Sequence, residues 1–171
     1  YTNTQVTVGN DVALEVLRFS ERYGEKFNTF FLSPSWSRST LNRGQFPTKG
    51  WRQNLSLEVA TPFSDLSFYK LSYSSNSYFP LDKDHDYVFR IRNEWNYGDG
   101  YGDTDRLPFY EHYFAGGIGS VRGFERNTLG LRTTTNPSRA SLPDPFGGNF
   151  LFENSAELIF PVPFVADQRS L

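Results

Sequence analysis

The stretch "YVFRIRNEWNY", residues 87–97, alternates between two kinds of side chain at every second position. One set is apolar apart from Asn93 and consists of Tyr87, Phe89, Ile91, Trp95 and Tyr97. The other set consists of Val88, Arg90, Arg92, Glu94 and Asn96. Successive side chains of a strand point to opposite faces of a sheet, so this period predicts a β-strand. Three consecutive charges on one face do not belong in the core of a β-sandwich.

The same alternation recurs along the chain. In the last segment Phe150, Phe152 and Leu158 oppose Glu153 and Glu157. Each strand is near the ~9–11 residues that cross a bilayer at a tilt. An apolar face and a wet face on every strand predict an all-β fold, an antiparallel transmembrane β-barrel. The expected strands cover about residues 1–8, 27–40, 51–62, 68–79, 87–97 and 150–160.

The composition agrees with strands that face two solvents. The chain has 171 residues with 17 Phe and 10 Tyr, yet its mean hydropathy is −0.54. Its formal charge of −2 provides no basic field for nucleic acid. Cysteine is absent, which excludes disulfides and thiolate metal sites within the sequence. No apolar run approaches the ~18 residues of a transmembrane helix.

Short and long connections also alternate. "NRGQFPTKG" (42–50) and "PLDKDHD" (80–86) are tight turns, whereas the opposite side carries longer inserts and a long loop over about 98–149. A helix is expected over about 11–23, with Asp11 as its cap and Val12, Val16, Phe19 and Tyr23 on one face. This helix either packs on the barrel rim or binds a partner.

Residues with catalytic or metal-binding chemistry are sparse. His85 and His112 are far apart in the sequence and form no metal-ligand or triad spacing. Glu153 and Glu157 are ~13 Å apart along one strand face, too far for a glycosidase pair. The loop "GDGYGDTD" (98–105) lacks EF-hand spacing. We therefore expect no catalytic residue, no metal and no cofactor.

The charged residues on the polar faces predict a hydrated barrel interior. No specific ligand is implied for any one of them, except for the acidic group that meets an arginine of the long loop. These lumen charges are Arg52, Glu58, Arg90, Arg92, Glu94, Glu153 and Glu157.

The long loop carries the tetrapeptide Val121, Arg122, Gly123, Phe124. Gly123 allows a positive φ or a close backbone approach, so that Arg122 and Phe124 project from a tight turn. The planar guanidinium of Arg122 suits a bidentate contact with a carboxylate.

These motifs together resemble a known family. "LNRGQFPTKG" (41–50), "YGDG" (97–100), "PFYEHYFAGG" (108–117) and "VRGFERNTLG" (121–130) are similar, in this order, to the BamA family of outer-membrane protein insertases. "VRGF" alone indicates only the wider group of insertases and two-partner secretion transporters. The turn and "FYEHYFAGG" favour the insertases.

The resemblance implies a sixteen-stranded barrel in the bacterial cell outer membrane, preceded by periplasmic POTRA domains. We expect this chain to be its middle part, about the seventh to the twelfth strand, without the POTRA region. The resemblance also implies that the loop folds into the lumen and that Arg122 contacts Glu157. A second acidic partner of Arg122 is expected beyond Leu171.

The implied function is folding and insertion of β-barrel proteins. The implied partners are outer-membrane lipid, nascent outer-membrane β-barrel substrates and lipoprotein subunits that bind mainly through the POTRA region. Nucleic acid is not expected. The alternatives are a two-partner secretion-type transporter with a plugging loop, a passive porin, and a soluble β-sandwich with a ligand site.

Overall fold

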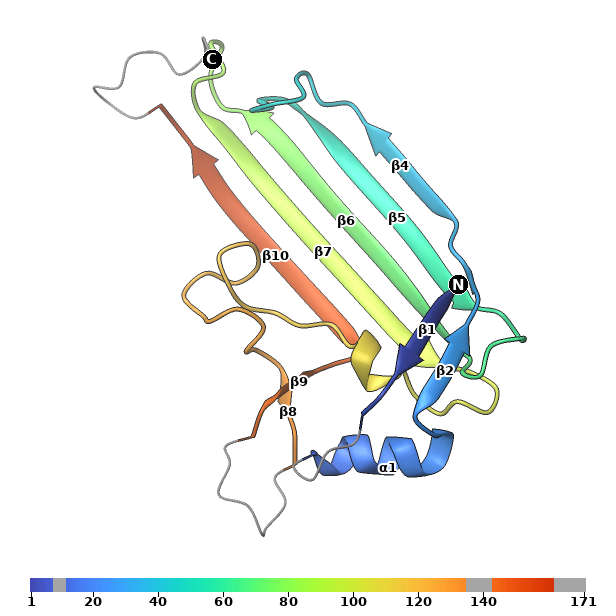
Figure 1. The fold of residues 1–171 in the computed structure, drawn as a ribbon. Helices are drawn as coiled ribbons and strands as arrows, with labels where there is room; N and C mark the ends of the chain where they lie inside the picture. Colours follow the sequence, from blue (N-terminus) through green and yellow to red (C-terminus); the bar gives the residue numbers. More distant parts are fainter. Residues whose placement is uncertain (8–11, 135–142, 162–171) are drawn as a thin grey trace.

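The computed structural model describes residues 1–7, 12–134 and 143–161. Its main feature is a tilted antiparallel sheet whose long strands lie side by side (Figure 1). The long strands are β5 (Gly50–Ala60), β6 (Phe68–Pro80), β7 (Val88–Gly100) and β10 (Phe150–Ile159). Neighbouring strands follow the order β10-β7-β6-β5, and β3 and β4 both pair with β5. The all-β antiparallel prediction is confirmed.

The register places like side chains in rows across the sheet. Trp95 lies opposite Tyr73 on one side and Phe152 on the other, and Tyr73 lies opposite Leu55. Next to this apolar row, Glu94 lies opposite Ser74 and Glu153. A one-residue slip would exchange the two faces, so this register keeps the apolar rows together on one face. We call that face outer and the charged face inner.

The first two predicted strands differ from the structure. The segment predicted over 27–40 is broken into β2 (Lys26–Thr29), β3 (Phe31–Leu32) and β4 (Ser35–Ser39). The amide of Phe30 donates to Ser64 Oγ instead of continuing a ladder, and Pro34 has no N–H to donate. β1 (Thr2–Gln5) is shorter than predicted and pairs with β2 in a separate two-stranded sheet.

A small hydrophobic core closes one end of the sheet. Phe27, Leu66 and Phe68 are nearly inaccessible there, together with Val6, Ala60 and Leu107. α1 (Leu14–Tyr23) packs Val16, Phe19 and Tyr23 against this core. The helix thus packs at the rim through the face that the sequence predicts. It begins after Ala13, and the predicted cap Asp11 lies outside the described residues.

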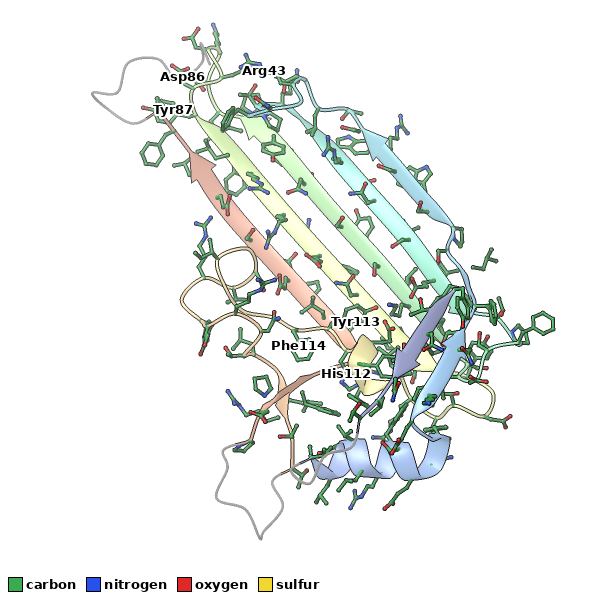
Figure 2. All side chains as sticks on the ribbon, in the orientation of Figure 1. Arg43, Asp86, Tyr87, His112, Tyr113 and Phe114 are labelled. Atoms are coloured by element: carbon green, nitrogen blue, oxygen red, sulfur yellow. The ribbon has the colours of Figure 1, made fainter. Side chains whose placement is uncertain are left out.

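The two ends of the sheet are unlike. The short turns around Arg43 and around Asp86 and Tyr87 lie at one end, while α1 and the loop segment with His112, Tyr113 and Phe114 lie at the other (Figures 1 and 2). The long loop contains the 3-10 turn η1 (Phe109–Glu111), β8 (Leu131–Arg132) and β9 (Pro145–Gly147). None of the helices in the described part of the chain is long and apolar enough to span a membrane.

Candidate functional site: the long loop on the inner face of β10

The inner face of β7 and β10 carries a set of paired charges. Arg90 Nη1 lies 3.2 Å from Glu157 Oε2, directly across the two strands. Arg90 Nη2 donates to Asn76 Oδ1 at 2.8 Å, and its guanidinium lies 5.6 Å from the ring centre of Tyr78. Arg90 is therefore held between β6 and β10 by contacts that do not involve the loop.

The tip of the long loop is a compact turn built on glycines. The amide of Ser120 donates to Gly117 O at 3.1 Å, and the amide of Gly116 donates to Ser120 Oγ at 3.0 Å. Gly116 has a φ of +113°, and a Cβ there would lie 2.4 Å from the carbonyl oxygen of Glu125. No residue with a side chain fits this position without moving the backbone.

Gly123 has a different role from Gly116. Its φ is +89°, but open space surrounds the position of a Cβ. Of the two reasons expected for this glycine, the structure shows a positive φ and not a close approach. The turn at Gly123 places Arg122 over β10 and leaves Phe124 53% exposed.

Arg122 and Glu157 are brought together as the resemblance implies. Arg122 Nη2 lies 3.1 Å from Glu157 Oε1, while the other carboxylate oxygen of Glu157 faces Arg90. The expected bidentate fork is therefore not formed, because Glu157 divides its two oxygens between two arginines. The Arg122 side chain is 72% exposed, so solvent screens this contact.

A second contact joins the loop to β10 four residues before Glu157. Ser120 Oγ donates a hydrogen bond to Glu153 Oε1, and Arg92 Nη2 lies 3.8 Å from Glu153 Oε2. The Glu153 side chain is 9% exposed. This contact is the more buried of the two.

The base of the loop is held by a charged cluster on β5 and β6. Lys70 Nζ lies 2.8 Å from Glu58 Oε1 and 2.6 Å from Glu111 Oε2, and Glu111 belongs to η1. Close by in the loop, burial raises the pKa of Tyr110. The ion pair of Lys70 with Glu111 anchors the loop at its base, and the contacts of Ser120 and Arg122 with β10 anchor it near its tip.

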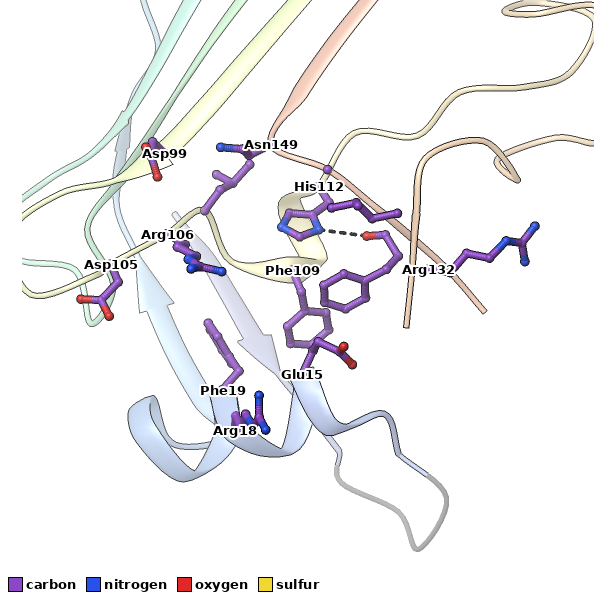
Figure 3. A pocket seen from close by; sticks show the side chains of 14 residues that line it. Glu15, Arg18, Phe19, Asp99, Asp105, Arg106, Phe109, His112, Arg132 and Asn149 are labelled. Carbon is purple, nitrogen blue, oxygen red and sulfur yellow. Dashed lines mark hydrogen bonds between the residues drawn. The ribbon is translucent and has the colours of Figure 1, made fainter. Parts of the chain in front are cut away.

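A cavity of about 760 Å³ is lined by residues of α1 and of the base of the loop (Figure 3). Phe19, Phe109 and Phe146 line it together with Arg18 and Arg106. His112 Nδ1 lies 2.9 Å from the carbonyl oxygen of Phe146 at the edge of this cavity. His85 is at the other end of the sheet, with Nδ1 3.1 Å from Thr48 Oγ1. Among the described residues there is no group of three or more His, Cys, Asp or Glu side chains that could hold a metal.

Comparison with known proteins places this arrangement in a family. Residues 1–171 match the Omp85 superfamily domain. The chain belongs to the Omp85 superfamily. It is 34% identical, over 136 residues and 80% of its length, to the outer membrane protein assembly factor BamA of Neisseria meningitidis. Its fold is similar to the crystal structure of BamA from Haemophilus ducreyi lacking POTRA domains 1–3, with a TM-score of 0.83 and 29% identity.

The Omp85 assignment confirms the expected place of the chain in the bacterial outer membrane, as part of a β-barrel. The chain covers 16% of the length of the Neisseria relative. The structural match covers 94% of this chain and 33% of the Haemophilus chain. Strands of an outer-membrane β-barrel turn their apolar face to lipid and their polar face to the lumen. The outer face of this sheet is therefore the one toward lipid, and the charged inner face is the one toward the lumen.

The lumen charges predicted from the sequence fall into three sets. Arg90, Arg92, Glu153 and Glu157 lie in the network under the loop tip, and Glu58 lies in the cluster at the loop base. Arg52 and Glu94 make no ion pair with any described residue, although Glu94 accepts a hydrogen bond from Asn96.

Sequence reasoning missed Ser120, Lys70 and Glu111. Alternation alone places Lys70 on the same face as Ser72 and Ser74, so the sequence does indicate that Lys70 faces the lumen. No comparable signal exists for Ser120 and Glu111, because irregular loop residues follow no period.

Proposed function

We propose that this Omp85-superfamily chain is the barrel portion of an outer-membrane protein insertase, which folds and inserts β-barrel proteins into the bacterial outer membrane. The observation that carries the proposal is the 34% identity to a protein named as an outer membrane protein assembly factor. The loop seated on the inner face of β10 supports the same proposal, since the Arg122–Glu157 contact is the one that the insertase family implies.

The proposed mechanism requires no bond-making chemistry. An unfolded β-barrel protein has unpaired backbone N–H and C=O groups, and a free strand edge is a template that satisfies them. Lipid on the outer face then receives the apolar side chains of the new strands. In this mechanism the chain acts without a cofactor and is not an enzyme.

The strands described here form part of the barrel wall, and the long loop supports this wall from the inner face. Lys70 fixes the base of the loop through Glu111, and the inner face of β10 receives the tip. A rigid wall keeps strand ends in register while one edge engages a substrate. The proposed partners are nascent outer-membrane β-barrel proteins, outer-membrane lipid and the lipoprotein subunits of an insertase complex.

The direct test uses the full-length protein that contains this chain, reconstituted in liposomes of bacterial outer-membrane phospholipid. An unfolded outer-membrane β-barrel protein is added, and its folding is followed by the shift in mobility of unheated samples on a denaturing gel. Faster folding than in empty liposomes is the expected result.

A different outcome would favour the transporter alternative. If the liposomes accumulate one polypeptide in their interior, and folding of barrel proteins is no faster than in empty liposomes, the insertase assignment is wrong. Liposomes that contain a passive porin of similar size provide the control for general disturbance of the bilayer.

A further inference from the structure

Glu153 lies in an unfavourable electrostatic position. The register places it directly opposite Glu94 across β7 and β10, on the inner face of both strands. Like charges directly opposite each other destabilise a strand pair. Because the Glu153 side chain is only 9% exposed, water compensates this repulsion poorly.

The loop supplies a hydrogen bond to the Glu153 side chain. Its carboxylate receives one side-chain hydrogen bond from the described residues, and the donor is Ser120 Oγ. Arg92 contributes charge, but at 3.8 Å its Nη2 is beyond hydrogen-bond distance. Removal of the Ser120 hydroxyl would leave the nearly buried carboxylate of Glu153 without a hydrogen bond from any described residue.

Ser120 is also built into the turn at the loop tip. Its Oγ accepts from the amide of Gly116 while its single hydroxyl proton is directed to Glu153. The amide of Ser120 donates to Gly117 O. The side chain therefore joins the geometry of the turn to one point on the wall.

Apolar contacts do little to hold the tip. Ile118 is 90% exposed and Phe124 is 53% exposed. A cavity of about 530 Å³ lies between the tip and β10. Polar contacts must therefore determine where the tip rests.

The two polar contacts are unequal. If Arg122 is lost, Glu157 keeps its contact with Arg90. If Ser120 is lost, Glu153 keeps no hydrogen bond to a described residue. We propose that Ser120 and Glu153 are the positioning pair that sets the long loop on β10, with Arg122–Glu157 as the weaker contact. Only the consequence of this pair for insertion rests on the proposed function.

The test measures amide hydrogen exchange over residues 116–124 in the full-length protein in detergent micelles. Ser120→Ala is expected to raise exchange there by about tenfold or more, because it removes a hydrogen bond to a charged group. Glu153→Gln is expected to raise it less, since a neutral amide accepts a weaker bond. Ser120→Thr keeps the hydroxyl and should restore slow exchange.

Two comparisons make the result specific. Arg122→Ala should raise exchange less than Ser120→Ala does. Arg52→Ala, on the inner face but without a loop contact, should leave exchange over 116–124 as in the wild type. The double variant Ser120→Ala/Glu153→Gln should exchange no faster than Ser120→Ala alone, because the two residues form one contact.

The proposal is overturned if Ser120→Ala exchanges like the wild type, if Arg122→Ala has the larger effect, or if the two changes in the double variant are additive. If Glu153→Gln does not reach the folded, heat-modifiable form, the comparison of Ser120→Ala with Ser120→Thr still tests the proposal. Because exchange is measured without a substrate, failure of the insertase assay and failure of this proposal are separate results.

Discussion

Glu157 faces two guanidinium groups that differ in their surroundings. Arg90 is 27% exposed in its side chain, bonds to Asn76 and lies over Tyr78, whereas the Arg122 side chain is 72% exposed. Solvent screening and side-chain entropy reduce the value of exposed ion pairs. Arg90 therefore contributes more to the wall than the arginine of the loop motif does.

The first prediction concerns Arg122→Ala in the full-length protein. We expect a loss of about 0–1 kcal/mol in the free energy of unfolding, as for other exposed ion pairs. The measurement is the temperature at which the folded, fast-migrating gel band is lost. Arg52→Ala, another exposed inner-face arginine, is the matched control and should cause no shift. A loss of several kcal/mol for Arg122→Ala would contradict this view.

The second prediction concerns Lys70, whose ammonium lies between Glu58 and Glu111. Lys70→Met would leave two carboxylates close together without a cation and should cost about 3–5 kcal/mol. Chemical denaturation of the full-length protein in detergent measures this loss. The triple variant Lys70→Met/Glu58→Gln/Glu111→Gln removes the repulsion and should recover most of the stability. A triple variant as unstable as the single one would show that repulsion is not the cause.

At the scale of single elements, the ring of Phe19 joins α1 to several of its neighbours. Phe19 has ring contacts with Tyr23, Phe27, Phe109 and Tyr110. Phe19 therefore joins the helix to both the core strand β2 and the 3-10 turn of the loop. Both of these ring contacts depend on the same side chain.

The third prediction is that Phe19→Ala detaches α1 while the sheet stays folded. Removal of a large aromatic side chain costs about 3 kcal/mol at a half-buried position. Proteolysis after Arg18 and Arg22 should become fast, and the heat-modifiable mobility of the barrel should be retained. Glu21→Ala, at an exposed position of the same helix, is the comparison for helix propensity alone. Slow proteolysis of Phe19→Ala would contradict the prediction.

A hydrogen-bonded carboxylate also ties α1 to the long loop. Thr134 donates to Glu15 Oε1 through its amide, at 2.9 Å, and through its hydroxyl. Burial pushes the pKa of Glu15 upward, but the bonds from Thr134 and the nearby Arg18 outweigh it, so the pKa lies below its ordinary value.

The fourth prediction follows from the sign of that shift. A depressed pKa in the folded state stabilises the contact above the ordinary carboxyl pKa of ~4.3, and this contribution is lost as the pH falls through the lower, folded value. The protection of α1 amides against hydrogen exchange, relative to the intrinsic rate at the same pH, should therefore fall below about pH 4. Glu15→Gln should remove this pH dependence, whereas Glu21→Gln, on the same helix, should not. A pH dependence that persists in Glu15→Gln would refute the assignment.

The elements differ in how far the sequence predicts them. Alternation is a local property, so the faces of β5, β6, β7 and β10 follow directly from the order of residues. The break at Phe30 does not, because it depends on Ser64, which is distant in the chain. The contact of Arg122 with Glu157 followed from family resemblance, but the contact of Ser120 with Glu153 depends on the path of an irregular loop. No pattern in the sequence encodes that path.

At the scale of the whole molecule, the apolar face of the sheet is uncovered. Leu71, Trp95, Phe150 and Phe152 on this face are each at least 42% exposed. β10 pairs with β7 along one edge, and no described residue pairs with its other edge. Exposed strand edges and large apolar patches promote association between chains.

The fifth prediction concerns residues 1–171 produced alone. In aqueous buffer the chain should form heterogeneous assemblies, and detergent should reduce their size by covering the outer face. Size-exclusion chromatography with light scattering measures both states. A monodisperse monomer without detergent would contradict the membrane-facing assignment of the outer face.

The pairing of β7 with β10 has a consequence for the order of assembly. These neighbours in the sheet are separated in the chain by the whole loop between Gly100 and Phe150. Closing such a distant contact is slow compared with the hairpins β5–β6 and β6–β7. The loop leaves β7 and enters β10 at the same end of the sheet, so its tip can reach the inner face after the two strands have paired. Docking of the loop tip on β10 is therefore a separate step that can follow the slow pairing of β7 with β10.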